Sequence, residues 1–148
     1  MIKYIGSKRL LVPRIVSLVR SLPSVSSVVD LFSGTSRVGH ALKRAGFFVT
    51  ANDHLAYATT LARCYVEADA RKLHALAEKV VKELALVPGC AGYFTETFCI
   101  QSRFFHPKNG ERIDAIRERI ELMELEEPLK SVALVSLMEA ADRVDSTT

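Results

Sequence analysis

Long apolar runs, cysteine and net charge are all scarce in this sequence, and each shortage excludes a class of protein. The apolar stretch over residues 10–22 is interrupted by Pro13, Arg14 and Arg20. It therefore predicts neither a membrane span nor the uninterrupted apolar core of about 7–15 residues that a signal peptide needs. The three cysteines lack C-x-x-C spacing, which argues against a zinc site or a disulfide framework. We expect a cytoplasmic protein with no metal site and no membrane contact.

The net charge of +3 is too small to indicate nucleic-acid binding by itself. The cations at the amino terminus nevertheless meet no acid before Asp30. They are Lys3, Lys8, Arg9, Arg14 and Arg20. Such a segment can contact phosphates, or it can be a solvated helix face whose arginine stems cover apolar surface. Both interpretations stay open at this point.

The most informative segment is Asp30–Gly39, where an apolar run ends in an acid and opens onto small residues. The β-branched residues of 27–29 predict a strand before it, and apolar residues at helical spacing predict a helix that ends at Gly46. Gly34 leaves room for close backbone approach, and the first free N–H groups of the helix can donate to an anionic group. The segment predicts a strand, a tight turn and a helix, with a nucleotide-type ligand at the turn.

A second strand is predicted over residues 47–51, and it ends at Asn52 and Asp53. Asp53 follows Asp30 by 23 residues, near the interval of about 20 at which dinucleotide-binding folds place a ribose-hydroxyl acceptor. We expect the two acids side by side at the carboxyl edge of a parallel sheet. The glycine pattern is weak by itself, because a serine replaces the middle glycine of G-x-G-x-x-G, and an ordinary βα turn is the alternative.

The segment Lys3–Lys8 places an aromatic face and two cations around a glycine, just before a predicted helix. Further segments belong to the same pattern: Asp30–Gly39, Asn52–Asp53, Tyr93–Glu96, Ser102–Gly110 and Arg112–Arg117. The combination covers most of the chain and resembles the amino-terminal half of the Dam-like, D12 class of adenine-specific DNA methyltransferases. The resemblance implies restriction-modification chemistry, in which a methyl group passes from S-adenosylmethionine to N6 of adenine in double-stranded DNA.

The resemblance also implies roles for residues that match the family's cofactor motifs. Tyr4 is implied to lie against the methionine or adenine portion of the cofactor, Lys8 beside a polar group, and Asp53 at the ribose hydroxyls. The complete predicted cofactor-binding set is Tyr4, Gly6, Lys8, Asp30, Phe32, Gly34, Asn52 and Asp53. Ser36 stands where the family often has glycine, and a serine would strain any positive φ there.

The family's catalytic motif, an Asp or Asn followed by two prolines and an aromatic, has no match here, because none of the five prolines is adjacent to another. We therefore name no catalytic residue. Only two strands are predicted with certainty, and the rest of the sheet is expected beyond residue 148. The sequence suggests an incomplete chain: an engineered truncation, a gene fragment or a split enzyme, whose sheet a second chain or a homodimer could complete.

The expected fold class is α/β, an incomplete Rossmann-like fold of S-adenosylmethionine-dependent methyltransferases with a helical insertion. We assign residues 1–87 to the cofactor-binding part and residues 88–148 to a helical region that leads into the DNA-recognition part. Residues 90–110 are expected to be an irregular, partly buried connection. Helices are predicted over residues 55–68, 69–87, 111–124 and 129–144.

The predicted DNA contacts are Arg103, His106, Lys108 and Arg112, because cations and aromatics are mixed in this segment. Three aromatics of the same region are expected in the core of a small subdomain instead: Phe94, Phe98 and Phe104. Charges alternate along the helix over residues 111–124, which predicts a salt-paired exposed face.

Three functions remain under consideration. The first is an adenine-specific DNA methyltransferase that is competent only if a catalytic loop arrives from elsewhere. The second is a noncatalytic remnant that binds S-adenosylmethionine, DNA or protein. The third is a nicotinamide-dependent oxidoreductase, which suits Asp53 and the βα turn but leaves Lys3–Lys8 unexplained.

Overall fold

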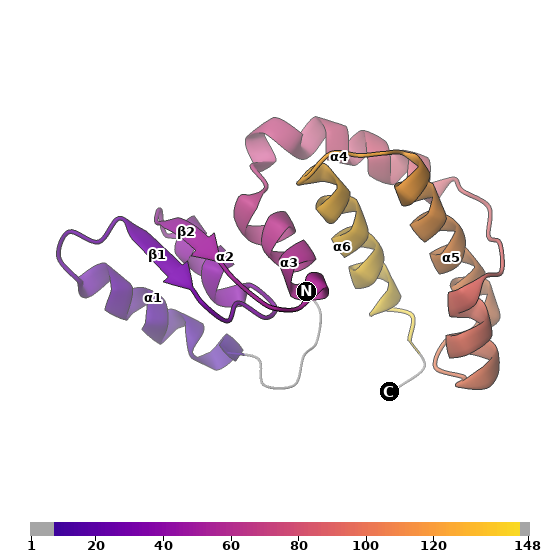
Figure 1. Cartoon of the computed structure of the whole chain (residues 1–148), viewed down its shortest axis with the longest axis horizontal. Coiled ribbons are helices and arrows are strands. Elements are labelled where there is room, and N and C mark those ends of the chain that lie inside the picture. The colour runs from indigo at the N-terminus through magenta and orange to yellow at the C-terminus, as the bar shows by residue number, and fades with distance from the viewer. Residues whose placement is uncertain (1–7, 146–148) are drawn as a thin grey trace. The chain divides into compact units, whose positions relative to one another are not determined.

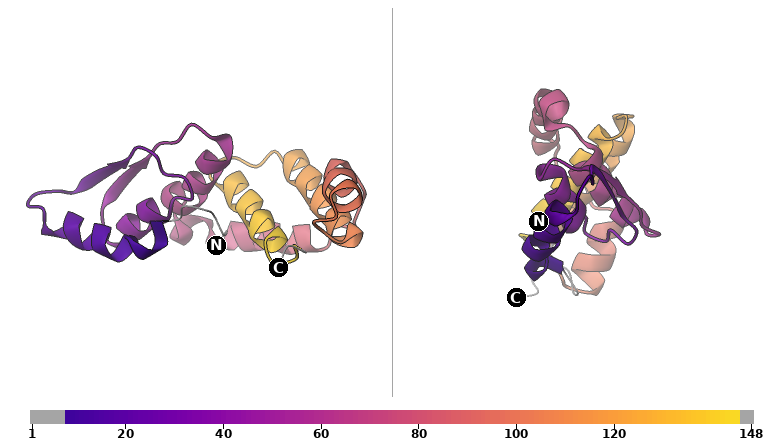
Figure 2. Two further views of the ribbon diagram at one scale, coloured as in Figure 1. Left: turned by 90° about the horizontal axis from the view of Figure 1, so that it is seen from below. Right: turned by 90° about the vertical axis from the view of Figure 1, so that its left-hand side faces the viewer.

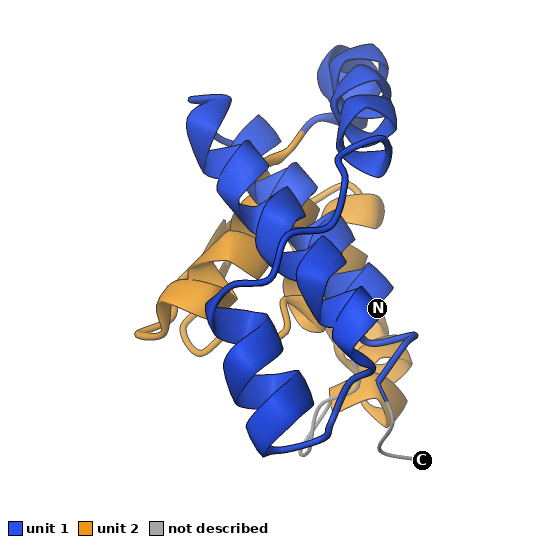
Figure 3. Cartoon of the chain, turned by 90° about the vertical axis from the view of Figure 1, so that its right-hand side faces the viewer, with its two compact units in different colours: residues 1–2, 69–148 blue, residues 3–68 orange. Residues whose placement is uncertain are grey.

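The computed structural model describes residues 8–145, which divide between Ala68 and Asp69 into two compact units (Figure 3). We call residues 8–68 the amino-terminal unit and residues 69–145 the helical unit. The helix over residues 70–85 belongs to the helical unit, although the sequence analysis grouped it with the cofactor-binding part. The functional boundary after residue 87 stays a prediction.

The amino-terminal unit consists of short helices around one pair of strands (Figure 1). Its elements are η1 (Lys8–Leu10), α1 (Val12–Ser21), β1 (Ser27–Asp30), α2 (Arg37–Arg44), β2 (Phe48–Ala51), α3 (Ala56–Ala62) and η2 (Arg63–Glu67). The helix predicted over 55–68 is confirmed in its first half. Its second half, η2, is a π-helix, a wider turn that the sequence analysis did not predict.

The two strands pair in parallel, with Ser27 opposite Phe48 and Asp30 opposite Ala51. The connection between them runs through α2, as a parallel crossover requires. Both predicted strands are therefore confirmed, and their carboxyl ends lie next to each other. No further strand pairs with them among residues 8–145.

One face of this sheet is covered and the other is not. Asp30 and Val49 face α2, where Gly39 lets the backbones approach: an added Cβ on Gly39 would lie 3.5 Å from Val49 Cγ1. On the opposite face, the side chains of Val29 and Phe48 are 59% and 73% exposed. Apolar side chains that a larger sheet would bury are thus accessible in this chain.

The helical unit contains α4 (Ala70–Ala85), η3 (Thr95–Gln101), α5 (Pro107–Leu122) and α6 (Leu129–Ala141). α5 and α6 lie side by side and α4 lies across them (Figures 1 and 2). Their core is formed by Val80, Leu84, Ile120 and Ala133. None of the helices in the described part of the chain is long and apolar enough to span a membrane.

The structure of the segment 90–110 and the start of α5 both differ from the prediction. η3 is a π-helix inside the segment 90–110, which was expected to be irregular, and it buries Thr95 and Cys99. α5 begins four residues before the predicted start at Glu111, because Pro107 occupies its first turn and His106 caps it. The His106 Nδ1 atom accepts a hydrogen bond from Lys108 N at 3.3 Å.

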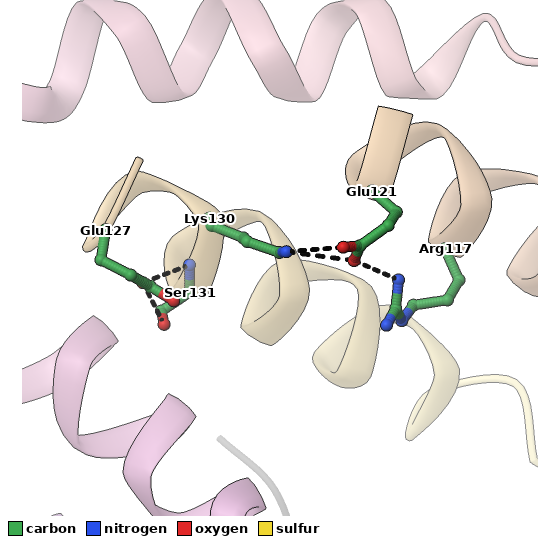
Figure 4. A network of polar contacts seen from close by, with 5 residues as sticks. All are labelled: Arg117, Glu121, Glu127, Lys130 and Ser131. Carbon is green, nitrogen blue, oxygen red and sulfur yellow. Dashed lines mark hydrogen bonds and ion pairs between the residues drawn. The ribbon is translucent and has the colours of Figure 1, made fainter. Parts of the chain in front are cut away.

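The predicted salt-paired face of α5 is confirmed only in part. Glu121 accepts from Arg117 at 3.1 Å and from Lys130 of α6 at 3.0 Å (Figure 4). Lys130 and Arg117 hold the pKa of Glu121 below its ordinary value. Next to this network, Glu127 accepts from the buried Ser131, with 2.6 Å between Oε2 and Oγ. The Glu121–Lys130 contact joins α5 to α6, whereas the Glu127–Ser131 contact is local to the start of α6.

Asp114 does not belong to that exposed face, which corrects the prediction for this residue. Its carboxylate accepts hydrogen bonds from Gly92 N (2.9 Å), Phe94 N (2.9 Å) and Thr95 N (2.8 Å), and from Thr95 Oγ1 (2.6 Å). Burial raises the pKa of Asp114, but the hydrogen bonds outweigh burial and the net pKa lies below the ordinary value. Asp114 thereby fixes the chain where it enters η3.

Replacing Asp114 by Asn should lower the free energy of unfolding by about 1–3 kcal/mol, because an amide nitrogen cannot accept the N–H groups that the second carboxylate oxygen accepts. Urea denaturation followed by circular dichroism measures the loss. The matched control is Glu118→Gln, which neutralises an exposed carboxylate on the same helix. Equal midpoints for the two variants would contradict this role for Asp114.

The same carboxylate predicts a pH dependence. Because the folded pKa of Asp114 is lowered, its stabilisation is complete above the unfolded pKa of about 4 and is lost as the pH falls through the folded pKa. Acidification below about pH 4 should therefore narrow the difference in unfolding free energy between wild type and Asp114→Asn. A difference that stays constant down to pH 2.5 would exclude the carboxylate as its source.

Candidate cofactor site

The carboxyl ends of β1 and β2 continue into two turns that hydrogen bond to each other. Asn52 N donates to Asp30 O at 2.8 Å, and Ser33 N donates to Asn52 O at 3.0 Å. Gly34 N donates to Asp53 Oδ2 at 2.8 Å, which ties the tip of the first turn to the acid of the second. The structure therefore brings together Asp30, Gly34, Asn52 and Asp53, as the sequence predicts.

Asp53 is held as a carboxylate by backbone donors. Leu55 N donates to Oδ1 at 3.0 Å, and together with the Gly34 N–H it keeps the pKa of Asp53 below its ordinary value. Each carboxylate oxygen has a second lone pair, so the group can still accept hydroxyl donors. The backbone contacts thus orient an ionised acceptor.

Space above the first turn is open. Gly34 has a φ of +51°, and among the described residues, its two chain neighbours aside, no atom lies within 4 Å of where a Cβ would be. A ligand can therefore approach this backbone closely. Phe32 beside it is 79% exposed, and Lys8 Nζ reaches Phe32 O at 3.4 Å although 24 residues separate them. The predicted residues Tyr4 and Gly6 lie outside the described part of the chain.

Three buried polar atoms beneath this turn have no hydrogen-bond partner among the described residues: Asp30 Oδ2, Ser33 Oγ and Ser36 Oγ. Buried polar atoms are normally paired, so a bound molecule or ordered water would complete them. Asp30 Oδ2 is turned inward, 3.9 Å from a Cβ built on Gly39 of α2. The sequence analysis missed Ser33, although a small hydroxyl residue beside a turn glycine is a usable signal.

Ser36 adopts the positive φ that the sequence analysis considered costly. Its φ is 56°, it is fully buried, and its side chain makes no capping hydrogen bond at the start of α2. A non-glycine residue in this region carries strain, which often persists at functional turns. The first turn is therefore strained where the family often has glycine.

A large cavity of this unit does not coincide with these residues. It has a volume of about 590 Å³ and follows the free side of β2, where Phe47, Phe48 and Arg63 contribute to its walls. Of the predicted cofactor-binding residues that the structure describes, Asp53 alone borders it. We place the candidate site at the joined turns because the oriented acid, the open glycine and the unpaired hydroxyls are there. Among the described residues, no cluster of His, Cys, Asp and Glu could hold a metal ion.

The predicted DNA contacts lie in the helical unit and differ in their surroundings. Arg103, His106 and Lys108 are exposed. Arg112 is half-buried, and its guanidinium donates to Ala85 O at 2.9 Å and to Val87 O. Arg112 thus caps the end of α4, a role that its basic character alone did not indicate.

Comparison with known proteins bears on the whole chain. The family model described as D12 class N6 adenine-specific DNA methyltransferase matches residues 4–148. The Type II methyltransferase M.NlaIII of Neisseria lactamica is 32% identical over 126 residues, which are 80% of this chain and 37% of that protein. The chain thus spans well under half the length of this relative. No solved structure is significantly similar to the chain.

Replacing Ser36 by Gly should raise the free energy of unfolding by about 1 kcal/mol, because glycine adopts a positive φ without strain and the lost hydroxyl has no partner. Thr35→Gly is the matched control, since Thr35 is also buried but does not have a positive φ. Urea denaturation should show Ser36→Gly more stable and Thr35→Gly less stable than wild type. Destabilisation by both changes would show that Ser36 is not strained.

Proposed function

Because the chain belongs to the D12 class of N6 adenine-specific DNA methyltransferases, we propose that its amino-terminal unit binds S-adenosylmethionine at the joined turns. The observation that carries this proposal is the Gly34–Asp53 contact, which sets an oriented carboxylate beside an open backbone turn. The proposed activity of the complete enzyme is methylation of adenine N6 in double-stranded DNA.

The surroundings of several predicted residues support a task in cofactor binding. Asp53 would accept the ribose hydroxyls, since backbone donors already hold it ionised and oriented. The exposed ring of Phe32 would cover an apolar part of the cofactor, and Lys8 would face a polar group. Asn52 shapes the second turn through its Nδ2 bond to Leu31 O at 3.0 Å. Tyr4, Gly6 and Asp30 remain in the proposed set on the resemblance.

S-adenosylmethionine supplies an electrophilic methyl group when bound. This chain's own contribution is to orient the cofactor and to exclude water from one side of it. The Pro-Pro motif that binds the adenine amine in the family has no match in the sequence. We therefore propose that transfer requires this loop from another segment or chain.

The sheet also supports the proposal that this chain forms only part of the enzyme. The two parallel strands with a helical crossover support the proposal that they begin a Rossmann-like sheet, which further strands complete. The exposed Val29 and Phe48 side chains offer the apolar face on which such a completion would pack. A second chain or a second copy of this one is the proposed source.

A noncatalytic binding module is the second candidate, and the missing Pro-Pro motif is the observation in its favour. This module would have the same cofactor site as the methyltransferase but would not transfer the methyl group. The nicotinamide-dependent alternative has no such support, because the family that the chain belongs to is one of DNA methyltransferases.

Calorimetric titration with S-adenosylmethionine tests the proposed site. Wild type should bind saturably, and Asp53→Ala should weaken binding by about tenfold to a hundredfold, the effect of losing hydrogen bonds to a charged group. Tyr4→Ala should also weaken binding. Asp53→Asn, which keeps one acceptor oxygen, should fall between wild type and Asp53→Ala.

Glu118→Gln is the control, since it removes an exposed carboxylate from α5 and should bind as wild type does. Circular dichroism of each variant checks that the unit is folded. A folded wild-type chain that takes up no S-adenosylmethionine would rule out the proposed site. Binding of a nicotinamide nucleotide in its place would favour the oxidoreductase.

A further inference from the structure

The loop between η3 and α5 contains a strained residue next to an exposed aromatic side chain. Arg103 has a φ of 56° although it is not glycine. Phe104 follows it and is 47% exposed, which corrects the expectation that Phe104 belongs to the core of a small subdomain. Strained residues of this kind cluster at functional sites, because the surrounding structure must hold them in place.

Backbone hydrogen bonds hold this loop. Phe98 O, at the middle of η3, accepts from both Phe104 N at 2.8 Å and Phe105 N at 3.3 Å. The ring of Phe105 packs against Phe94 with 5.0 Å between centroids, and Phe94 packs against Phe98 at 4.8 Å. Phe105 is therefore anchored in the aromatic cluster while its neighbour Phe104 stays accessible.

The charged residues of the loop itself are all basic. Arg103, His106 and Lys108 are exposed, and the sequence contains no acid from residue 97 to residue 110. One acid from elsewhere in the chain lies next to the loop, because Asp145 forms an isolated antiparallel bridge with Phe105. Because His106 Nδ1 accepts from Lys108 N, the neutral ring carries its proton on Nε2. Cations that flank an aromatic ring are suited to a stacked base between phosphates.

Another exposed aromatic residue of the same unit has the opposite surroundings. Tyr93 is 77% exposed, and the shallow cavity beside it is bordered by Asp114, Glu118 and Glu121 as well as by Arg117. Acidic surroundings disfavour a polyanion. Exposure of an aromatic side chain therefore does not by itself distinguish Phe104; the strained loop, whose own charged residues are all basic, does.

We propose that Phe104 stacks on a nucleobase of the DNA substrate, at the position opened when a base leaves the duplex, while Arg103, His106 and Lys108 contact the flanking phosphates. This inference rests on the proposed function, because it requires that DNA is the substrate. A methyltransferase that acts on a base must take it out of the stack, and an aromatic side chain offsets part of that cost. The turn at Arg103 holds the Phe104 ring in place before DNA arrives.

The test uses the full chain and a 20-base-pair duplex with a central 2-aminopurine opposite an abasic site. Fluorescence anisotropy gives affinity, and 2-aminopurine emission reports stacking. Phe104→Leu, which keeps apolar volume but loses the ring, should weaken binding by about fivefold to a hundredfold, the range that alanine substitution of stacking residues spans. It should also leave 2-aminopurine emission unquenched, whereas Phe104→Trp should retain both affinity and quenching.

Tyr93→Ala is the matched control and should bind as wild type does. Circular dichroism confirms that each variant folds, which the partial exposure of Phe104 favours. Equal affinity and equal quenching for wild type and Phe104→Leu would overturn the stacking role and leave DNA binding intact. An equal loss in Tyr93→Ala would also overturn it. Failure of the wild-type chain to bind any duplex would overturn both this inference and DNA as the substrate.

Discussion

The hydrogen bond from Gly34 N to the Asp53 carboxylate is the contact on which the candidate site depends. It joins two turns whose bonded residues are 19 positions apart in the chain. Its acceptor is Asp53 Oδ2, which belongs to the carboxylate that the proposed function needs as an acceptor. The same bond helps to keep Asp53 ionised, because a backbone donor stabilises the charged form. The hydrogen bond that closes the βαβ segment therefore also orients the Asp53 carboxylate.

The helical unit uses the same device for a different purpose. Asp114 gathers the backbone N–H groups of the segment that enters η3, and Arg112, two residues before it on α5, donates to carbonyls at the end of α4. Each of these charged side chains satisfies backbone groups that would otherwise lack partners. The loop that contains Phe104 follows η3, so its geometry depends on Asp114 indirectly. Charged side chains in this unit therefore organise backbone as well as pair with one another, as Arg119 does with Glu83.

Periodicity and turn chemistry predicted the elements that carry the cofactor site. Short runs of β-branched and aromatic residues located both strands, helical apolar spacing located the crossover helix, and the small residues after Asp30 located the turn. Contacts between side chain and backbone could not be predicted in this way. Asp114 and Arg112 have the spacing of a salt-paired helix face, but both side chains hydrogen bond to backbone groups. The residue pattern does not indicate which backbone groups will lie near a side chain. Adjacent phenylalanines presented the same difficulty, because composition does not say that Phe105 turns inward and Phe104 outward.

Gly39 shows what the glycine motif in such folds reports. A Cβ on this residue would lie 3.0 Å from Val66 Cγ2, so glycine here allows α2 to pack closely against η2. Gly34, by contrast, faces open space among the described residues. Of these two glycines, only Gly34 is thus informative about a ligand. Gly39 instead reflects the close packing of the crossover helix. The glycine spacing by itself is therefore compatible with nicotinamide enzymes and with methyltransferases, and the residues that separate the two classes have to be sought outside it.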